Sequence, residues 1–257
     1  AGGKFPKKSS ELIPKLEKEN LKLCSGWYGA NLLKNTVKEE IALMRDQLDL
    51  FKDCKAPCMV LAEVSGSVQG EVKTPLSKRP ILNSEEWKLF YYKINEIAKH
   101  MEDNGVPLAY HHHMGTVVQS QEDTERLIDN TSNAVKLLID TGHMMFAGGD
   151  FVKVAKDYSS RLYHIHCKDI RKDILENSLN NDLSFIDAFF AGAFTVPGDG
   201  CIDYEIFLKL LKDLNYQGWL VVEAEQDPNK ANPLEYGKIG FNHLKKIALN
   251  CGFKITR

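Results

Sequence analysis

Short apolar runs alternate with longer charged stretches along most of this 257-residue chain. The runs are rich in β-branched residues and the stretches have a helical period, a pattern typical of parallel strands joined by crossover helices. We expect six strands, near residues 21 to 26, 57 to 63, 106 to 111, 135 to 140, 162 to 167 and 218 to 223. Helices are expected over residues 8 to 19, 36 to 53, 84 to 104, 123 to 132, 150 to 160, 182 to 191, 203 to 214 and 232 to 249. The sequence therefore predicts an α/β fold built on a parallel sheet.

Length and composition favour a single domain. Chains of about 250 residues often form one α/β barrel, and no linker or low-complexity segment interrupts this one. The composition, with 43% hydrophobic and 26% charged residues, is that of a globular protein with a sizeable core. We therefore predict one domain over residues 1 to 257.

Charge, cysteine usage and motif content argue against several classes of partner. The net charge is −2 and the basic residues form no stripe, so nucleic acid is not expected. No apolar run reaches the roughly 20 residues that span a bilayer, so we expect no membrane partner. The six cysteines include no Cys-x-x-Cys pair, which predicts reduced thiols in the cytoplasm. Gly148-Gly149 and Gly198-Asp199-Gly200 lack the spacing of a nucleotide-binding loop, so no nucleotide cofactor is expected.

Four of the expected strands end in residue types that bind metals or transfer protons. Because the C-terminal ends of parallel strands converge on one face, these side chains should meet there. Mixed imidazoles and carboxylates suit Mn, Co, Fe or Zn, whereas an all-oxygen set would suggest Mg or Ca. The residues of this expected site are His111, Asp140, His166 and Glu223.

Alternation along a strand gives each end residue a neighbour on the same side. The resulting pairs are His111 with His113, His164 with His166, and Glu223 with Glu225. His112 should point away from the site, into packing or a hydrogen bond.

Structural roles compete with functional ones at each position. A single buried histidine is more often a hydrogen-bonded core residue than a ligand, but carboxylates buried at several strand ends are costly unless paired or metal-bound. Glu63 ends another strand and fits either a substrate-binding rim or an ion pair inside the barrel. Lys168, Asp169 and Arg171 could bind substrate or form a salt-bridge cluster.

Several strings closely resemble the myo-inosose-2 dehydratase family, a branch of the xylose-isomerase-like (β/α)8 TIM barrels. They are HHHMGTVVQ (111 to 119), DTGHMMFAGGD (140 to 150), HIHCKDIR (164 to 171), FTVPGDGCIDY (194 to 204) and GWLVVEAEQDP (218 to 228). Upstream, GGKFP (2 to 6), SGWY (25 to 28), AEVSGSVQG (62 to 70) and PLSKRP (75 to 80) extend the resemblance over essentially the whole chain.

The resemblance implies a lyase that removes water from 2-keto-myo-inositol (scyllo-inosose), giving 3D-trihydroxycyclohexane-1,2-dione. It implies a divalent metal, Mn or Co, and a cyclic polyol ketone as substrate. In the family, GGKFP follows the second strand, so we expect the barrel to lack its first one to two βα units in this chain. An open barrel has unpaired edges, which would favour pairing with a partner element or a homo-oligomer.

The wider group binds its metal through a Glu, an Asp, a His and a second Glu. By position, Asp140, His166 and Glu223 match this set, whereas His111 replaces the first Glu. The fourth ligand is therefore His111, His113 or a water. His143, three residues after Asp140, matches the position of a residue that contacts the substrate in the family.

Dehydration next to a ketone needs a base for the α proton and an acid for the departing hydroxyl. We expect the base to be His113, His143 or Glu225, and the acid to be another histidine or Lys168. Glu63, His111 and Arg171 are the expected substrate contacts. Ketose 3-epimerases and sugar isomerases of the same barrel are the alternative, because they share the proton abstraction. A further alternative is a protein that binds metal or sugar without catalysing a reaction.

Overall fold

The computed structural model describes residues 5–256, so the first three residues of the GGKFP string lie outside its described part. Within this part, six strands form one parallel sheet in the order β1-β2-β3-β4-β5-β8. They are β1 (Trp27–Ala30), β2 (Met59–Glu63), β3 (Leu108–His111), β4 (Val135–Asp140), β5 (Leu162–Cys167) and β8 (Leu220–Val222). A short antiparallel pair, β6 (Asp169–Ile170) and β7 (Phe194–Thr195), stands apart. The predicted α/β fold with a parallel sheet is confirmed.

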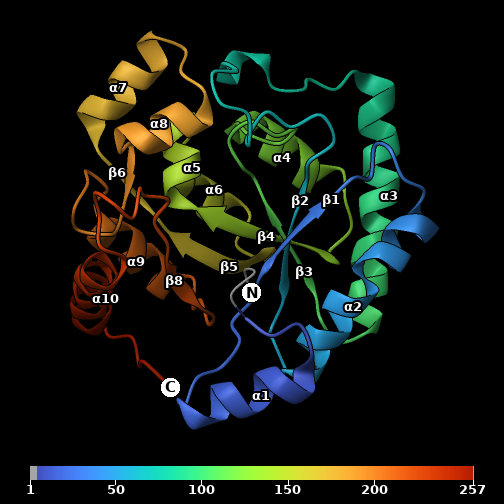
Figure 1. The fold of residues 1–257 in the computed structure, drawn as a ribbon, viewed down its shortest axis with the longest axis horizontal. Helices are drawn as coiled ribbons and strands as arrows, with labels where there is room; N and C mark the ends of the chain where they lie inside the picture. Colours follow the sequence, from blue (N-terminus) through green and yellow to red (C-terminus); the bar gives the residue numbers. More distant parts are fainter. Residues whose placement is uncertain (1–4, 257) are drawn as a thin grey trace.

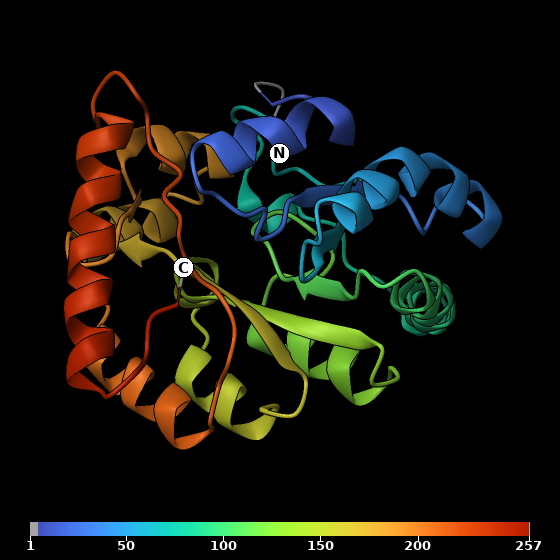
Figure 2. The ribbon, with the colours of Figure 1, turned by 90° about the horizontal axis from the view of Figure 1, so that it is seen from below.

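Most of the described helices surround the outer face of the curved sheet, and others lie beyond the C-terminal ends of the strands (Figures 1 and 2). The described helices take the following bounds. They are α1 (Ser9–Lys18), α2 (Val37–Asp53), α3 (Ser84–Asp103), α4 (Gln121–Asp129), α5 (Thr141–Phe146), α6 (Phe151–Asp157), α7 (Lys172–Asn180), α8 (Phe185–Ala191), α9 (Tyr204–Asp213) and α10 (Pro233–Asn250). None of the described helices is both long and apolar enough to cross a membrane.

Side chains alternate between the two faces of the sheet. On the outer face, residues such as Leu61, Tyr110 and Ile139 pack with the helices in the main hydrophobic core. On the inner face, a smaller apolar cluster fills the barrel: Cys58, Val60, Ala109 and Leu138. Two residues beyond Ala109 and Leu138, the same inner face carries His111 and Asp140. The period of two thus places apolar packing and the polar site on one face, in consecutive layers.

The first expected strand is wrong in position. Residues 21 to 26 are irregular, and β1 begins at Trp27, where it pairs in register with Val60 of β2. Leu21, at the start of the expected strand, is 59% exposed. Helices α5 and α7 and strands β6 and β7 were not expected. Their segments are short, and tertiary contacts rather than a long periodic pattern define them.

Arg161 ties β4 and β5 together from a buried position. Its guanidinium donates to the backbone carbonyl of Val135 at 2.6 and 2.8 Å. It also donates to the carbonyls of Ile128 (3.3 Å) and Thr131 (3.1 Å). The side chain therefore satisfies the carbonyls that lead into β4, the strand that ends at Asp140.

Replacing Arg161 with Ala should lower the free energy of unfolding by about 3 kcal/mol, because several buried carbonyls lose their donor. Urea denaturation measures the change. Lys99→Ala, in an exposed ion pair with Asp103, is the control and should change the free energy by no more than about 0.5 kcal/mol. Equal effects of the two substitutions would contradict the role given to Arg161.

Candidate metal centre and catalytic pocket

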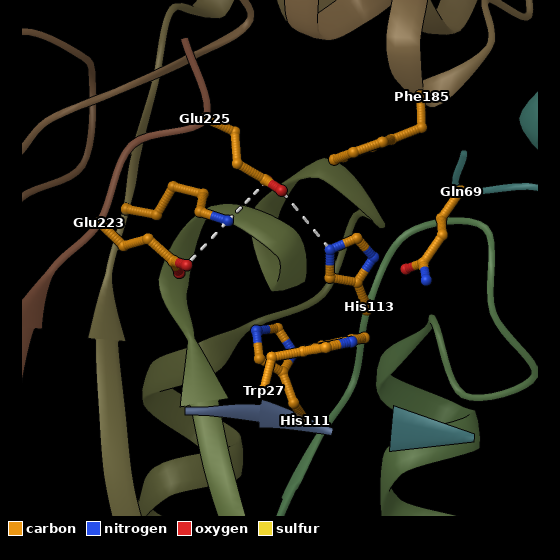
Figure 3. A pocket seen from close by; sticks show the side chains of 8 residues that line it. Trp27, Gln69, His111, His113, Phe185, Glu223 and Glu225 are labelled. Carbon is orange, nitrogen blue, oxygen red and sulfur yellow. Dashed lines mark hydrogen bonds and ion pairs between the residues drawn. The ribbon is translucent and has the colours of Figure 1, made fainter. Parts of the chain in front are cut away.

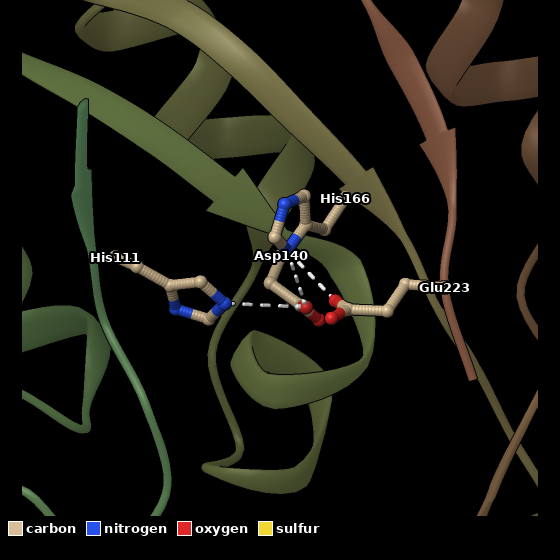
Figure 4. A group of neighbouring side chains, drawn as sticks. All are labelled: His111, Asp140, His166 and Glu223. Carbon is tan, nitrogen blue, oxygen red and sulfur yellow. Dashed lines mark ion pairs between the residues drawn. The ribbon is translucent and has the colours of Figure 1, made fainter. Parts of the chain in front are cut away.

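Four side chains from neighbouring strands converge at the C-terminal end of the sheet (Figure 4). Asp140 and His166 are paired in register at the ends of β4 and β5, His111 ends β3, and Glu223 follows β8. One ligand atom from each lies within 4.8 Å of the others. The structure thus brings together the four residues that the sequence placed at one site.

Three atoms of this cluster have no hydrogen-bond partner, although all are buried: Asp140 Oδ2, His166 Nδ1 and Glu223 Oε2. Asp140 Oδ2 lies 3.6 Å from both His111 Nε2 and His166 Nδ1. His166 Nδ1 and Glu223 Oε2 are 2.7 Å apart but form no hydrogen bond. Buried polar atoms are rarely left unpaired. Two imidazoles and two carboxylates with unused electron pairs form a donor set that fits a divalent transition metal.

The other atoms of these ligands are held by the protein. His111 Nδ1 lies 2.5 Å from the carbonyl oxygen of His112 and must donate to it, which leaves an electron pair on Nε2. Asp140 is the N-cap of α5, where its Oδ1 accepts the backbone N–H of His143 at 2.9 Å. Each of the two ligands therefore turns a free atom toward the cluster, an arrangement that pre-orients metal ligands.

Lys168 sits beside the cluster with 1% of its side chain exposed. Its ammonium lies 2.7 Å from Glu225, 3.4 Å from Asp140 and 3.5 Å from Glu223. Burial acts to lower the pKa of Lys168, but the three carboxylates raise it above its ordinary value. Burial likewise acts to raise the pKa of Glu223, and His166 and Lys168 lower it to about 2. Lys168 and these carboxylates are therefore charged at neutral pH.

A second group lies across Lys168 from the first: His113, His143 and Glu225. The two imidazole rings are 3.9 Å apart between centroids. His113 Nδ1 lies 2.8 Å from the carbonyl oxygen of Met114 and must donate to it, so the neutral ring has its electron pair on Nε2, 3.7 Å from Glu225.

Both nitrogens of His143 are engaged by protein groups. Nδ1 accepts the Met114 N–H at 3.3 Å, and Nε2 lies 2.9 Å from Lys168 and 3.2 Å from Glu225. Burial above all, with the neighbouring His113 and Lys168, lowers the pKa of His143 to about 3.

A cavity of about 300 Å³ opens above both groups (Figure 3). This volume is at the small end of the range for ligand-binding clefts. Its wall is formed by Trp27, Gln69, His111, His113, Lys168, Phe185, Glu223 and Glu225. Trp27 packs edge-on against His111 and His113, and Phe185 against His113. Sequence reasoning did not single out Trp27, Gln69 or Phe185 as site residues, because they lie on the edge strand, in a long loop and at the start of α8.

Two expected substrate contacts lie elsewhere among the described residues. Glu63 is buried and accepts the backbone N–H groups of Leu32 (2.5 Å) and Ser65 (2.7 Å), so it fixes the ends of two loops. Arg171 pairs with Asp199 at 2.5 Å and donates to the carbonyl oxygen of Gly192. Neither residue belongs to the wall of this cavity, and Arg171 lines a second, smaller one. Arg171 is thus in an ion pair, as its structural alternative proposed, whereas Glu63 is held by backbone N–H groups and not by the ion pair that was considered for it.

Two further histidines have structural surroundings. His112 points away from the cluster, as expected, and its Nε2 accepts the backbone N–H of Asp140 at 3.2 Å. His164 shares the inner face with His166 but lies 3.3 Å from Ser25, deeper in the barrel. Asp169, next to Lys168, accepts the backbone N–H groups of Ile170, Gly198 and Ile202 and so holds the loop after β7.

Comparison with known proteins agrees with this geometry. Residues 5–247 match the family described as xylose isomerase-like TIM barrel. Rhizopine catabolism protein MocC of Rhizobium meliloti is 43% identical over 255 residues, covering 99% of this chain and 78% of the relative. An inosose dehydratase of Clostridium perfringens is 40% identical over 247 residues, covering 95% of this chain and 83% of the relative.

A solved structure of the IOLI protein with a bound zinc atom has a similar fold. It matches with a TM-score of 0.62 and 17% identity, over 94% of this chain and 84% of that one. The family match and the relatives at about 40% identity cover nearly all of the chain. The chain therefore belongs to the xylose isomerase-like TIM barrel family, in the branch that contains the inosose dehydratases.

Proposed function

We propose that this protein dehydrates 2-keto-myo-inositol to 3D-trihydroxycyclohexane-1,2-dione in myo-inositol catabolism. The observation that carries the proposal is the cluster of His111, Asp140, His166 and Glu223 beside a small cavity, in which Asp140, His166 and Glu223 each have a buried atom without a hydrogen-bond partner. Relatives named inosose dehydratase at about 40% identity support the reaction. The six cysteines are all free, which agrees with the cytoplasm as the proposed compartment.

We assign the metal to the four-residue cluster, with His111 as the fourth ligand. His113 is the less suitable alternative, because its Nε2 faces Glu225 rather than Asp140. Mixed imidazole and carboxylate ligands suit Mn or Co. When bound, such an ion acts as a Lewis acid that stabilises negative charge on a neighbouring ketone oxygen.

His113 is the proposed base for the proton next to the ketone. It lines the cavity and, in its neutral form, presents an unprotonated Nε2. The Glu225 carboxylate lies 3.7 Å from this nitrogen. His143 is less suited, because both of its nitrogens face protein groups and its pKa is far below neutral.

Lys168 is the proposed acid for the departing hydroxyl. When the C–O bond breaks, its electron pair stays on oxygen, and a proton from the ammonium completes the water molecule. Lys168 lines the cavity, and its charge is held by three carboxylates. The proton taken by His113 and the proton given by Lys168 balance the loss of one water.

The cavity wall suits a polyhydroxylated ring. Trp27 and Phe185 offer apolar surfaces to the C–H faces of the ring, and the Gln69 amide can pair with a hydroxyl. The volume of the cavity fits a small molecule.

Product analysis should separate this activity from that of an epimerase or isomerase. Purified metal-loaded protein given 2-keto-myo-inositol should produce a dione with new ultraviolet absorbance. A saturated cyclic ketone or sugar as the product would refute the dehydratase proposal in favour of its alternative. Asp140→Ala serves as the inactive control.

Replacing Asp140 or His166 with Ala should abolish metal binding and turnover together, because each removes a ligand with an unpaired atom. Metal content is measured by mass spectrometry of dialysed protein. Asp199→Asn is the matched control, because Asp199 pairs with Arg171 outside the cavity wall and its loss should leave the metal in place. An active, metal-free Asp140→Ala protein would contradict the assignment.

The His113→Gln variant should keep its metal and lose about 10² to 10⁴ in kcat, because the cavity loses its free basic nitrogen. The rate of solvent deuterium incorporation into the substrate at the carbon next to the ketone, measured by NMR, should fall with kcat. Full activity in this variant would show that a residue other than His113 is the base.

A further inference from the structure

Within the described cavity wall, Gln69 is the one side chain whose hydrogen-bond donors and acceptor are both free (Figure 3). The charged side chains of the wall lie in ion pairs with Lys168 or with histidines. His111 and His113 each donate the proton on Nδ1 to a backbone carbonyl oxygen. The amide of Gln69, in contrast, makes no hydrogen bond with the described part of the chain. It can therefore accept from and donate to hydroxyl groups of a ligand.

The backbone that carries Gln69 is held by the carbonyl oxygen of Gly115. This oxygen accepts the N–H of Val68 and the hydroxyl of Ser67, each at 3.0 Å. Ser67 Oγ in turn accepts the N–H of Gln69 at 3.1 Å. Gly115 has a φ of +80°, and a Cβ there would lie 2.8 Å from the backbone nitrogen of Gln69. Only glycine permits this conformation and this close approach, so the loop is fixed where it carries the amide.

The turn that contains Gly115 also fixes His113, the proposed base. The N–H of His113 donates to the carbonyl oxygen of Val118 at 3.0 Å. The hydroxyl of Thr116 lies 2.9 Å from the carbonyl oxygen of His113 and 3.0 Å from that of Val118. Backbone hydrogen bonds therefore set the position of Gln69 relative to His113. A ring that presents its α carbon to His113 meets the amide at a defined place.

Gln69 lies away from the groups that would act on the reacting oxygens. In Figure 3, His113 lies between Gln69 and Glu223. Glu223 belongs to the proposed metal cluster, and Lys168, the proposed acid, lies 3.5 Å from it. The ketone and the departing hydroxyl would therefore face Glu223 and Lys168. The amide of Gln69 remains for a hydroxyl that the reaction does not remove.

We propose that Gln69 determines substrate specificity by pairing its amide with one of the hydroxyls that remain in the trihydroxy product. It selects cyclic polyol ketones that carry a hydroxyl at that ring position. This inference rests on the proposed function, which supplies the substrate and places its ketone at the metal cluster. A hydrogen bond to a hydroxyl that does not react stabilises the bound substrate and the transition state equally, so it lowers KM and leaves kcat nearly unchanged.

The test compares metal-loaded wild type and Gln69→Met on 2-keto-myo-inositol and on its monodeoxy analogues, each of which lacks one hydroxyl on a ring carbon that the elimination leaves unchanged. Met has nearly the length of Gln and lacks the amide. Gln69→Met should raise KM about tenfold for the full substrate, the value of one hydrogen bond, at nearly constant kcat. For the single analogue that lacks the partner hydroxyl, the two proteins should have the same KM. Where an analogue is not converted, its inhibition constant takes the place of KM.

Two further variants complete the experiment. Gln69→Asn carries a shorter amide that no longer reaches the ring, so it should show the same selective loss. Gln217→Met is the matched control, because Gln217 is exposed and lies outside the cavity wall. It should leave KM and kcat unchanged for every substrate.

An equal loss on every substrate, no loss on any, or a fall in kcat at unchanged KM in folded Gln69→Met would overturn the inference. Failure of the wild type to release water from 2-keto-myo-inositol would instead contradict the proposed function, so the two failures are distinguishable. Circular dichroism confirms that each variant is folded before its kinetics are compared.

Discussion

Three carboxylates lie close together at the C-terminal end of the parallel sheet, and their mutual repulsion is the main electrostatic constraint on this structure. Asp140 has no solvent exposure, whereas Glu223 and Glu225 keep 36% and 28% of their side chains exposed. Carboxylates this close together repel one another and need cations to remain ionised. Lys168 supplies one positive charge, and the cluster of His111, Asp140, His166 and Glu223 is the proposed site of a divalent ion.

The sheet provides the geometry that makes such compensation possible. Parallel strands end on one face, and their period of two puts Asp140 and His166 on the inner face beside each other in register. Below them the inner face is apolar, with Ala109 and Leu138 filling the barrel. Three of the four proposed ligands, His111, Asp140 and His166, lie on strands rather than loops, which restricts their movement, and Glu223 directly follows β8. Arg161 strengthens the same region, since it satisfies the carbonyls that lead into β4.

Backbone groups determine what each side chain can do. His111 and His113 both have Nδ1 engaged by a carbonyl oxygen, so both present Nε2 to the pocket. Their roles differ because of their neighbours: His111 faces Asp140, whereas His113 faces Glu225. Two histidines on the same side of one chain segment thus become a proposed ligand and a proposed base. The intervening His112 supports the next strand through the backbone of Asp140.

The sequence alone determined the parallel α/β fold, the strand ends at His111, Asp140, His166 and Glu223, and the direction of His112, because these follow from local periodicity. It could not place β1, whose position depends on pairing with β2, nor the short elements α5, α7, β6 and β7. Glu63 and Arg171 also matched the pattern of site residues, yet backbone groups and Asp199 hold them away from the cavity wall. The tertiary structure alone decided that Trp27, Gln69 and Phe185 complete this wall and that Lys168 lies between two ligand groups. Those contacts join segments far apart in the chain, and no local pattern encodes distances between such segments.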